Sequence, residues 1–211
     1  MEEGEGNMTA YIWDLDGTLI DSYEVIVTAA RQTVAEAGIE EDEATVLRSI
    51  KGASLTRYLK QAGERTGRTY DEMEARYREL THVLDDRIPL MDGAAEALES
   101  LRKQGAAHYV YTHRGSSSRP ILERLGIWEM FSEVVTHDEG FAPKPSGEGV
   151  RYLVGRHRLD PENTWYVGDR SLDVLCAKDA GVKAMLLLPE DSPVVPTGRE
   201  DRIIQSLWEL V

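Results

Sequence analysis

The chain has 211 residues, of which 41% are hydrophobic and 29% charged, and its formal net charge is -14 at pH 7. This length and composition predict a folded protein with a sizeable core, in one domain or in one domain with a large insertion. The negative charge argues against nucleic acid and against an anionic membrane surface as the main partner, because both would repel the chain. Small anions remain suitable ligands wherever a few cations and main-chain amides converge.

The first eight residues are acidic, and we expect them to be a disordered or vector-derived leader before a natural start at Met8. No apolar run reaches the roughly 20 residues of a membrane-spanning helix. The N-terminus also lacks the basic and apolar regions of a signal peptide, so we expect a cytoplasmic protein. The single Cys176 lies in an apolar helical stretch and is expected in the core.

The first predicted strand begins near Ala10 and ends on two acidic residues at alternate positions, Asp14 and Asp16, followed by Gly17. Residues two apart on an extended chain point the same way, and the glycine allows an immediate turn. Two like charges at one strand end are unfavourable unless a cation or a substrate compensates them. The pattern therefore indicates a ligand site, although by itself it is equally typical of a strand followed by an acidic turn.

The region from residue 21 to residue 87 contains no convincing strand. Its periodicity predicts helices at Tyr23 to Ala37, Glu43 to Ile50, Leu55 to Gly63 and Asp71 to Leu84. A block of helices directly after a first strand is typical of an all-helical insertion. We therefore predict a helical cap at 21–87 and a core formed by 9–20 and 88–211.

From Asp92 onward, predicted helices alternate with predicted strands. The helices are Ala94 to Gln104, Arg119 to Leu125, Gly149 to His157, Leu172 to Ala180 and Asp201 to Leu210. The strands are Ala107 to Thr112, Val134 to Thr136, Thr164 to Gly168 and Lys183 to Leu188. With the first strand, this alternation predicts an α/β fold with a parallel five-stranded sheet covered on both faces. Ligands of such a sheet bind beyond the carboxyl ends of its strands.

Polar side chains follow three of these strands, and one lysine lies between two prolines in the loop before the Gly149 helix. The set is Asp14, Asp16, Thr112, His113, Arg114, Lys144, Asp169 and Asp173. In a parallel sheet, the positions after the strands converge on one edge. Carboxylate ligands without paired histidines favour magnesium over zinc, so Mg²⁺ is the expected cofactor.

These residue types suit phosphoryl transfer, in which positioning and charge neutralisation supply most of the acceleration. Thr112 can donate a hydrogen bond to a phosphoryl oxygen, and Lys144 supplies a positive charge. Asp14 is placed to attack phosphorus and form an aspartyl-phosphate. Asp16 is placed to protonate the leaving alcohol and then to deprotonate the attacking water.

From Ala10 to about Leu188, the chain resembles the haloacid dehalogenase superfamily. Four motifs carry the resemblance, and their order and spacing are more specific than any one of them. They are Asp14-Leu-Asp16-Gly-Thr18-Leu, Thr112, Lys144 in Pro-Lys-Pro, and Gly168-Asp169 with Asp173. The resemblance implies a Rossmann-like parallel sheet with a helical cap inserted after the first strand.

The resemblance also implies roles for the acidic residues. Asp14 would be the nucleophile and Asp16 the general acid and base. A magnesium ion would be held by Asp14, Asp169 and the main-chain carbonyl of Asp16, and Asp173 would support the metal site. Halide-removing and phosphonate-cleaving members generally lack an acid at the position of Asp16, since they have no alcohol to protonate. Asp16 therefore implies phosphate ester chemistry.

The predicted cap resembles that of the phosphoglycolate phosphatase group, in which the loop corresponding to Lys51-Gly52-Ala53-Ser54 reaches the active site. We therefore expect Arg48, Lys51 and Ser54 to contact the substrate, although exposed cations at a helix boundary are an equally typical interpretation. The expected partner is a small phosphorylated metabolite, with no obligate protein partner.

Two positions need separate comment. Members commonly carry Asn directly after the Thr of the second motif, whereas this chain has His113 followed by Arg114. We expect both residues to contact substrate, and the departure leaves phosphoglycolate and other small phosphates open as substrates. Arg170, which follows the fourth motif, is expected to be a solvated arginine, with contact to substrate or cap as the alternative.

Two other functions fit parts of the pattern. A phosphomutase of the same fold would pass the phosphoryl group to a sugar, but such hexose-phosphate mutases typically place a histidine on the first cap helix. The corresponding residues here begin with Tyr23-Glu24-Val25, without histidine, which favours hydrolysis. A response-regulator receiver also collects aspartates, a Thr and a Lys on a parallel sheet. Receivers have no large insertion after the first strand, which disfavours this signalling function.

Overall fold

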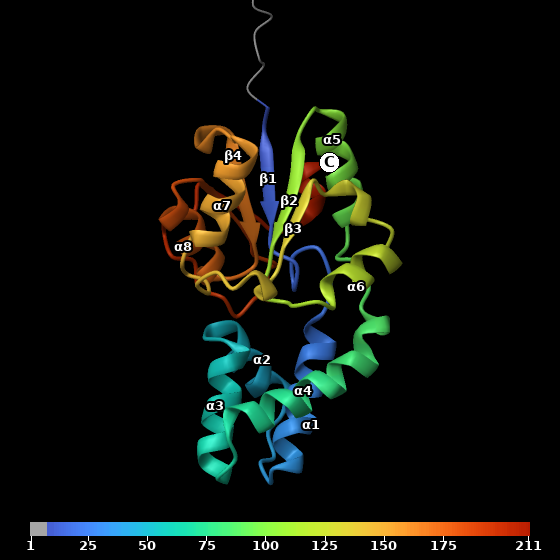
Figure 1. The fold of residues 1–211 in the computed structure, drawn as a ribbon, viewed down its shortest axis with the longest axis vertical. Coiled ribbons are helices and arrows are strands. Elements are labelled where there is room, and N and C mark those ends of the chain that lie inside the picture. The colour runs from blue at the N-terminus through green and yellow to red at the C-terminus, as the bar shows by residue number, and fades with distance from the viewer. Residues whose placement is uncertain (1–7) are drawn as a thin grey trace, which may run out of the picture. The chain divides into compact units, whose positions relative to one another are not determined.

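The computed structural model describes residues 8–211, so most of the predicted leader lies outside the described residues. The chain forms two compact units (Figure 1): one ends at Ile20 and resumes over Leu90–Val211, and the other is Asp21–Pro89. The first unit contains all the strands of the described chain, and the second is helical. Among the described residues, no helix has the length and apolar character needed to span a membrane.

The α/β unit is built on a parallel sheet of six strands. They are β1 (Ala10–Trp13), β2 (Ala107–Tyr111), β3 (Glu133–Val135), β4 (Thr164–Gly168), β5 (Lys183–Leu187) and β6 (Arg202–Ile204). The strand order is β3-β2-β1-β4-β5-β6, and each neighbouring pair is parallel. After β1, the chain adds β2 and β3 on one side of β1, and then β4, β5 and β6 on the other side. This arrangement places the topological switch point, where α/β sheets bind ligands, at the end of β1.

Helices cover both faces of this sheet. They are α5 (Ala94–Lys103), α6 (Ser118–Arg124), α7 (Glu148–His157) and α8 (Ser171–Ala180). Residues of α7 and α8, including Leu153 and Cys176, share one core cluster with Ile12 of β1. On the opposite face, His108 of β2 bonds the carbonyl of Leu98 in α5 at 3.0 Å. The predicted α/β fold with a parallel sheet is therefore confirmed, and the buried Cys176 is a core residue as expected.

The C-terminal segment differs from the predicted helix at Asp201 to Leu210. Arg202–Ile204 forms a sixth strand instead, and Leu207–Leu210 is a short 3-10 helix. Ile203 and Ile204 are β-branched and favour a strand. The outer edge of the sheet also offers backbone partners, because the amide of Leu188 donates to the carbonyl of Ile204 at 2.8 Å. Pairing with the sheet therefore outweighs the helical pattern.

The second unit contains α1 (Tyr23–Glu36), α2 (Glu43–Gly52), α3 (Leu55–Thr66) and α4 (Tyr70–Leu84). Its core includes Val34, Leu59 and Met73, one from each of three helices. A short 3-10 helix, Asp85–Arg87, follows α4 in this unit. The described part of the α/β unit has further 3-10 helices at Trp128–Met130, His137–Glu139 and Pro161–Asn163. That the helical unit acts as a cap over the site stays a prediction.

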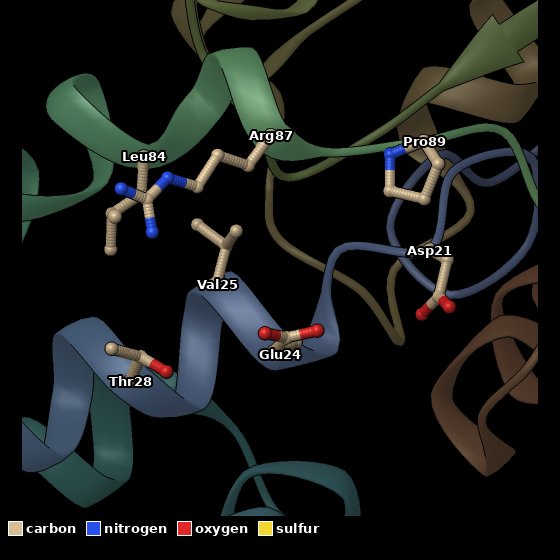
Figure 2. A pocket seen from close by; sticks show the side chains of 7 residues that line it. All are labelled: Asp21, Glu24, Val25, Thr28, Leu84, Arg87 and Pro89. Carbon is tan, nitrogen blue, oxygen red and sulfur yellow. The ribbon is translucent and has the colours of Figure 1, made fainter.

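A small pocket lies within the helical unit, between the start of α1 and the end of α4 (Figure 2). Its volume is about 110 Å³, and it is lined by Asp21, Glu24, Val25, Thr28, Leu84, Arg87 and Pro89. Sites for small metabolites are usually about 300 Å³ or larger. Because the pocket is small and contains no predicted catalytic residue, it is not our candidate for the active site.

The buried His108 predicts a pH dependence of stability. Its Nδ1 accepts a hydrogen bond from the Trp13 indole at 3.1 Å, and burial lowers its pKa to about 4. In the unfolded chain a histidine has a pKa of about 6.5. The unfolded chain therefore takes up a proton that the folded protein does not, and stability present above pH 6.5 is lost as the pH falls towards 4.

Comparison with a His108→Gln variant isolates this effect, because the other titrating groups are common to both proteins. At pH 5, the lowered pKa of His108 should have reduced the free energy of unfolding of the wild type by about 2 kcal/mol. We therefore expect the stability advantage of the wild type over the variant, measured by urea unfolding, to be about 2 kcal/mol smaller at pH 5 than at pH 7.5. An advantage that is the same at both pH values would contradict the assignment.

Candidate active site

Asp14 lies directly after β1 and is fully buried. Its amide donates to the carbonyl of Val167 at 2.8 Å, so the pairing with β4 extends to this residue. Its Oδ1 accepts a hydrogen bond from Nζ of Lys144 at 2.7 Å. Its Oδ2 is also buried and has no hydrogen-bond partner among the residues that the structure describes. One oxygen of this carboxylate is therefore held in place, and the other, 3.6 Å from Nη2 of Arg170, accepts no hydrogen bond from the described residues.

Lys144 joins two acidic residues that come from different elements, the end of β1 and the start of α8. Besides Asp14, its Nζ donates to Oδ1 of Asp173 at 2.8 Å, and the lysine side chain is completely buried. Asp173 lies in the first turn of α8, where its Oδ2 also accepts from the amide of Arg170 at 3.0 Å. A buried ion pair is favourable only when good geometry and additional hydrogen bonds accompany it, and this pair has both.

The turn after β4 brings Asp169 beside these groups. Carboxylate oxygens of Asp14, Asp169 and Asp173 all lie within 4.8 Å of one another. The close approach requires glycine at position 168, because a Cβ there would lie 2.4 Å from the Cβ of Asp173. The predicted convergence of Asp14, Lys144, Asp169 and Asp173 on one edge of the sheet is thus present in the structure.

The charges of this cluster favour a divalent cation. Three buried carboxylates lie here with two cations, Lys144 and Arg170, so the cluster has more acidic than basic groups. Oxygen atoms of carboxylates are the ligands that Mg²⁺ prefers, and oxygens from all three acids lie close enough together to share one ion. The residues present therefore fit a magnesium ion, with Asp14 and Asp169 as the side chains best placed to hold it.

The pKa shifts in the cluster follow from burial and from the ion pairs. Burial raises the pKa of Asp14 to about 7, against the opposing charge of Lys144. Burial would also lower the pKa of Lys144 and raise that of Asp173. Here the ion pairs dominate, so the pKa of Lys144 is raised and the pKa of Asp173 is lowered. Lys144 and Asp173 are therefore charged near neutral pH, and Asp14 is the acid whose ionisation an added cation would assist most.

Thr112 and His113 follow β2. The amide of Thr112 donates to the carbonyl of Val135 at 3.0 Å, which fixes the residue at the same edge of the sheet. His113 accepts a hydrogen bond on Nε2 from the amide of Lys144 at 2.9 Å. Burial, together with the charges of Lys144 and Arg170, lowers the pKa of His113 to about 3. His113 is therefore neutral and supports the loop that carries Lys144; its contact with substrate stays a prediction.

Arg114 forms an ion pair with Asp16. Its Nη2 donates to Oδ1 of Asp16 at 2.8 Å, and its Nε lies 3.1 Å from the same oxygen. The carboxylate of Asp16 does not belong to the group of three acids around Lys144. A metal contact through the main-chain carbonyl of Asp16, which the family resemblance implies, stays a prediction.

Arg170 is not the solvated arginine that we expected from the sequence. Its side chain is only 12% exposed, and its Nη2 lies 3.6 Å from Oδ2 of Asp14. Its Nε lies 3.9 Å from Asp169 and 4.0 Å from Asp173. The start of α8 turns the arginine toward the acids on either side of it. In the sequence, Arg170 lies between the motif residues Asp169 and Asp173, and this position is the signal that could have predicted its contact with the acids.

The remaining predicted contacts lie on the helical unit. Arg48 and Lys51 belong to α2, where Arg48 donates to Oγ1 of Thr45 at 3.1 Å and Lys51 lies 4.1 Å from the ring centre of Tyr23. Ser54 accepts from the amide of Arg57 at 3.1 Å and so caps α3. These contacts are local to the helical unit, and a role in substrate binding stays a prediction for all three.

Comparison with known proteins identifies the family. The sequence model of the haloacid dehalogenase-like hydrolases matches residues 11–187 of this chain. The chain belongs to this family. The match contains all four motifs and the whole helical unit, so the resemblance predicted from the motifs is confirmed.

The relatives of this haloacid dehalogenase-like hydrolase include named phosphatases. Pyrophosphatase PpaX from Bacillus velezensis is 32% identical over 178 residues, which cover 83% of this chain and 81% of that protein. A phosphoglycolate phosphatase from Vibrio vulnificus is 29% identical over 182 residues, which cover 80% of this chain and 78% of that protein. Both agree with the phosphatase branch that Asp16 indicated.

Solved structures of the family agree with the fold. A crystal structure of a predicted phosphoglycolate phosphatase from Haemophilus somnus superposes with a TM-score of 0.80 at 24% identity and covers 98% of each chain. A HAD family hydrolase from Deinococcus radiodurans, solved with bound phosphate and sodium, gives a TM-score of 0.75 at 20% identity. It covers 97% of this chain and 93% of that one.

Proposed function

We propose that this hydrolase is a magnesium-dependent phosphatase that cleaves a small phosphate monoester through an aspartyl-phosphate on Asp14. The observation that carries the proposal is the position of Lys144, which holds one oxygen of Asp14 at 2.7 Å and leaves the other buried and without a hydrogen-bond partner among the described residues. A carboxylate held at one oxygen, beside a cation, is arranged for nucleophilic attack by the other.

In the first step, Oδ2 of Asp14 forms a bond to phosphorus while the bond to the ester oxygen breaks, and Asp16 gives its proton to the departing alcohol. In the second step, Asp16 takes a proton from a water molecule whose oxygen attacks the phosphorus, which releases phosphate and regenerates Asp14. Lys144 and the hydroxyl of Thr112 bind phosphoryl oxygens throughout. A magnesium ion held by Asp14 and Asp169 supplies positive charge that offsets the carboxylates and the phosphoryl oxygens.

The proposed substrate resembles those of the named relatives, with phosphoglycolate as the first candidate and pyrophosphate as the second. The purified protein should be assayed with both, and with sugar and nucleotide monophosphates, in the presence of Mg²⁺. We expect release of inorganic phosphate from at least one small monoester. Absence of release from every member of this panel by a folded protein would contradict the proposal.

Removal of the metal tests the proposed cofactor in two independent ways. Hydrolysis should be abolished in excess EDTA and restored by Mg²⁺. Because only the folded protein assembles the three acids, Mg²⁺ should also raise the free energy of unfolding, by about 2.7 kcal/mol at a concentration 100 times its dissociation constant. The melting temperature with and without Mg²⁺ provides this second readout. Undiminished turnover in EDTA would exclude the metal assignment.

Thr112 provides a further test of the site. Thr112→Val keeps the shape of the side chain but removes the hydroxyl, so we expect kcat to fall on the order of 10²-fold, as for other single transition-state donors. Thr112→Ser retains the hydroxyl and should keep most of the activity. The two variants should be compared at saturating substrate; equal rates for Val and Ser would remove Thr112 from the phosphoryl-binding group.

A further inference from the structure

The pairing of Arg114 with Asp16 was not foreseen from the sequence, in which the two residues are 98 positions apart. They meet because β1 and β2 are neighbouring parallel strands, so the positions after the two strands lie at the same edge of the sheet (Figure 1). Both Nε and Nη2 of the guanidinium approach the carboxylate, at 2.8 to 3.3 Å. This two-pronged contact fixes the plane of the carboxylate as well as its position.

The backbone of Arg114 is itself held on both sides. Its amide donates to Oγ1 of Thr112 at 3.1 Å, and its carbonyl accepts from the amide of His137 at 3.2 Å. Its Nη1 donates to Oγ of Ser117 at 3.2 Å, and its side chain is only 8% exposed. An arginine held at its amide, its carbonyl and its guanidinium is preorganised. It is arranged as a fixed support for Asp16 rather than as a mobile arm that reaches for a ligand.

We propose that Arg114 is a positioning residue that holds the Asp16 carboxylate in the orientation from which it transfers protons. The inference rests on the proposed function, since it assigns Arg114 to the acid and base step of that reaction. Gly17 turns the chain directly after Asp16 with a φ of 78°, so the backbone leaves the strand there and Arg114 supplies the lateral support. The guanidinium also stabilises the charged carboxylate that remains after the proton has passed to the leaving alcohol.

This role differs from substrate binding, which we predicted for Arg114 from the sequence. An arginine that binds an acidic group of the substrate acts on KM, and only for substrates that carry such a group. An arginine that positions Asp16 slows the first step, the attack of Asp14 on the ester, when it is removed, and only when the leaving group needs a proton. The second step, in which Asp16 activates water, is the same for every substrate. Alkyl phosphates release an alkoxide that must be protonated, whereas p-nitrophenyl phosphate releases a stable phenolate. The leaving group therefore separates the two roles.

The test compares Arg114→Met with the wild type on phosphoglycolate, glycerol 2-phosphate and p-nitrophenyl phosphate. The rate of the first step is measured as release of the leaving group in a single turnover. For both alkyl phosphates we expect this rate to fall by about tenfold or more, because a small misplacement of a catalytic group costs this much. Single-turnover release of p-nitrophenolate should change by less than about threefold, since this step needs no acid. Asp16→Asn should give the same pattern with larger losses. The double variant should then lose no more alkyl phosphatase activity than Asp16→Asn alone, because Arg114 acts only through Asp16.

Arg119→Met is the matched control, since it removes an exposed arginine of α6 whose Nε lies 2.8 Å from Glu123. It should leave all three substrates unaffected. Arg114→Lys keeps the charge without the two-pronged contact and should restore only part of kcat; it also serves if the methionine variant does not fold. Equal losses in the rate of the first step on all three substrates would overturn the proposal in favour of a structural role. A higher KM for phosphoglycolate alone would overturn it in favour of substrate binding. If the wild type cleaves neither alkyl phosphate, the alkyl phosphate of the wider panel that it does cleave takes their place; a wild type that hydrolyses no member of that panel would instead refute the proposed function.

Discussion

Asp14→Asn is expected to abolish hydrolysis of every substrate that the wild type cleaves. The substitution preserves the size of the side chain, but an amide is not a nucleophile toward phosphorus, so the covalent step has no attacking atom. Because the position is fully buried between Lys144 and Asp169, no other group among the described residues takes its place at the end of β1. The measurement is kcat with Mg²⁺ on the best substrate of the panel.

The control for this substitution is Asp191→Asn, which makes the same chemical change at an exposed position far along the chain from the four motifs. It should retain wild-type turnover. Circular dichroism should confirm that Asp14→Asn is folded. Wild-type rates for a folded Asp14→Asn protein would exclude the covalent route and would require another nucleophile.

Lys144→Met has the second largest expected effect, because Nζ bonds both Asp14 and Asp173. We expect kcat/KM to fall by on the order of 10²-fold or more, as for the loss of other groups that stabilise a transition-state charge. The substitution also leaves buried carboxylates without their partner. Removing one member of a buried pair typically costs about 3 to 5 kcal/mol of stability. Both kcat/KM and the free energy of unfolding should be measured. The free energy of unfolding should be measured by urea unfolding in EDTA.

Magnesium should offset part of this loss of stability, since it supplies positive charge to the same acids. Lys103→Met is the matched control, because Lys103 is 71% exposed and its pair with Glu99 lies at the surface. It should change neither quantity appreciably. If Lys144→Met retains activity within about twofold of the wild type, the phosphoryl-binding site has been misplaced.

The arrangement of the sheet could be predicted from sequence wherever apolar runs are long. Strands β1, β2, β4 and β5 are buried on both faces of a parallel sheet and are therefore nearly continuous in apolar residues. Strand β6 has only Ile203 and Ile204 between polar neighbours, and its pairing with β5 decides its structure. A local pattern of three residues does not contain that tertiary information.

The backbone positions of the site could also be predicted, but its side-chain pairs could not. Lys144 and Asp14 are 130 positions apart, yet the four motifs of the family placed both in one site. The pairing of Arg114 with Asp16 and the turn of Arg170 toward Asp14 depend on rotamers and on the start of α8, which no motif specifies. Both arginines were therefore assigned to substrate or solvent until their contacts were known.

Detection of the covalent intermediate tests the central claim most directly. Wild-type protein should be mixed with substrate and Mg²⁺, quenched in acid within the first turnover and analysed by peptide mass spectrometry. We expect a fraction of the protein to carry one phosphoryl group on Asp14, which hydroxylamine should remove because it cleaves acyl phosphates. An actively hydrolysing enzyme that carries the phosphoryl group on another residue, or on none at any time point, would contradict the account.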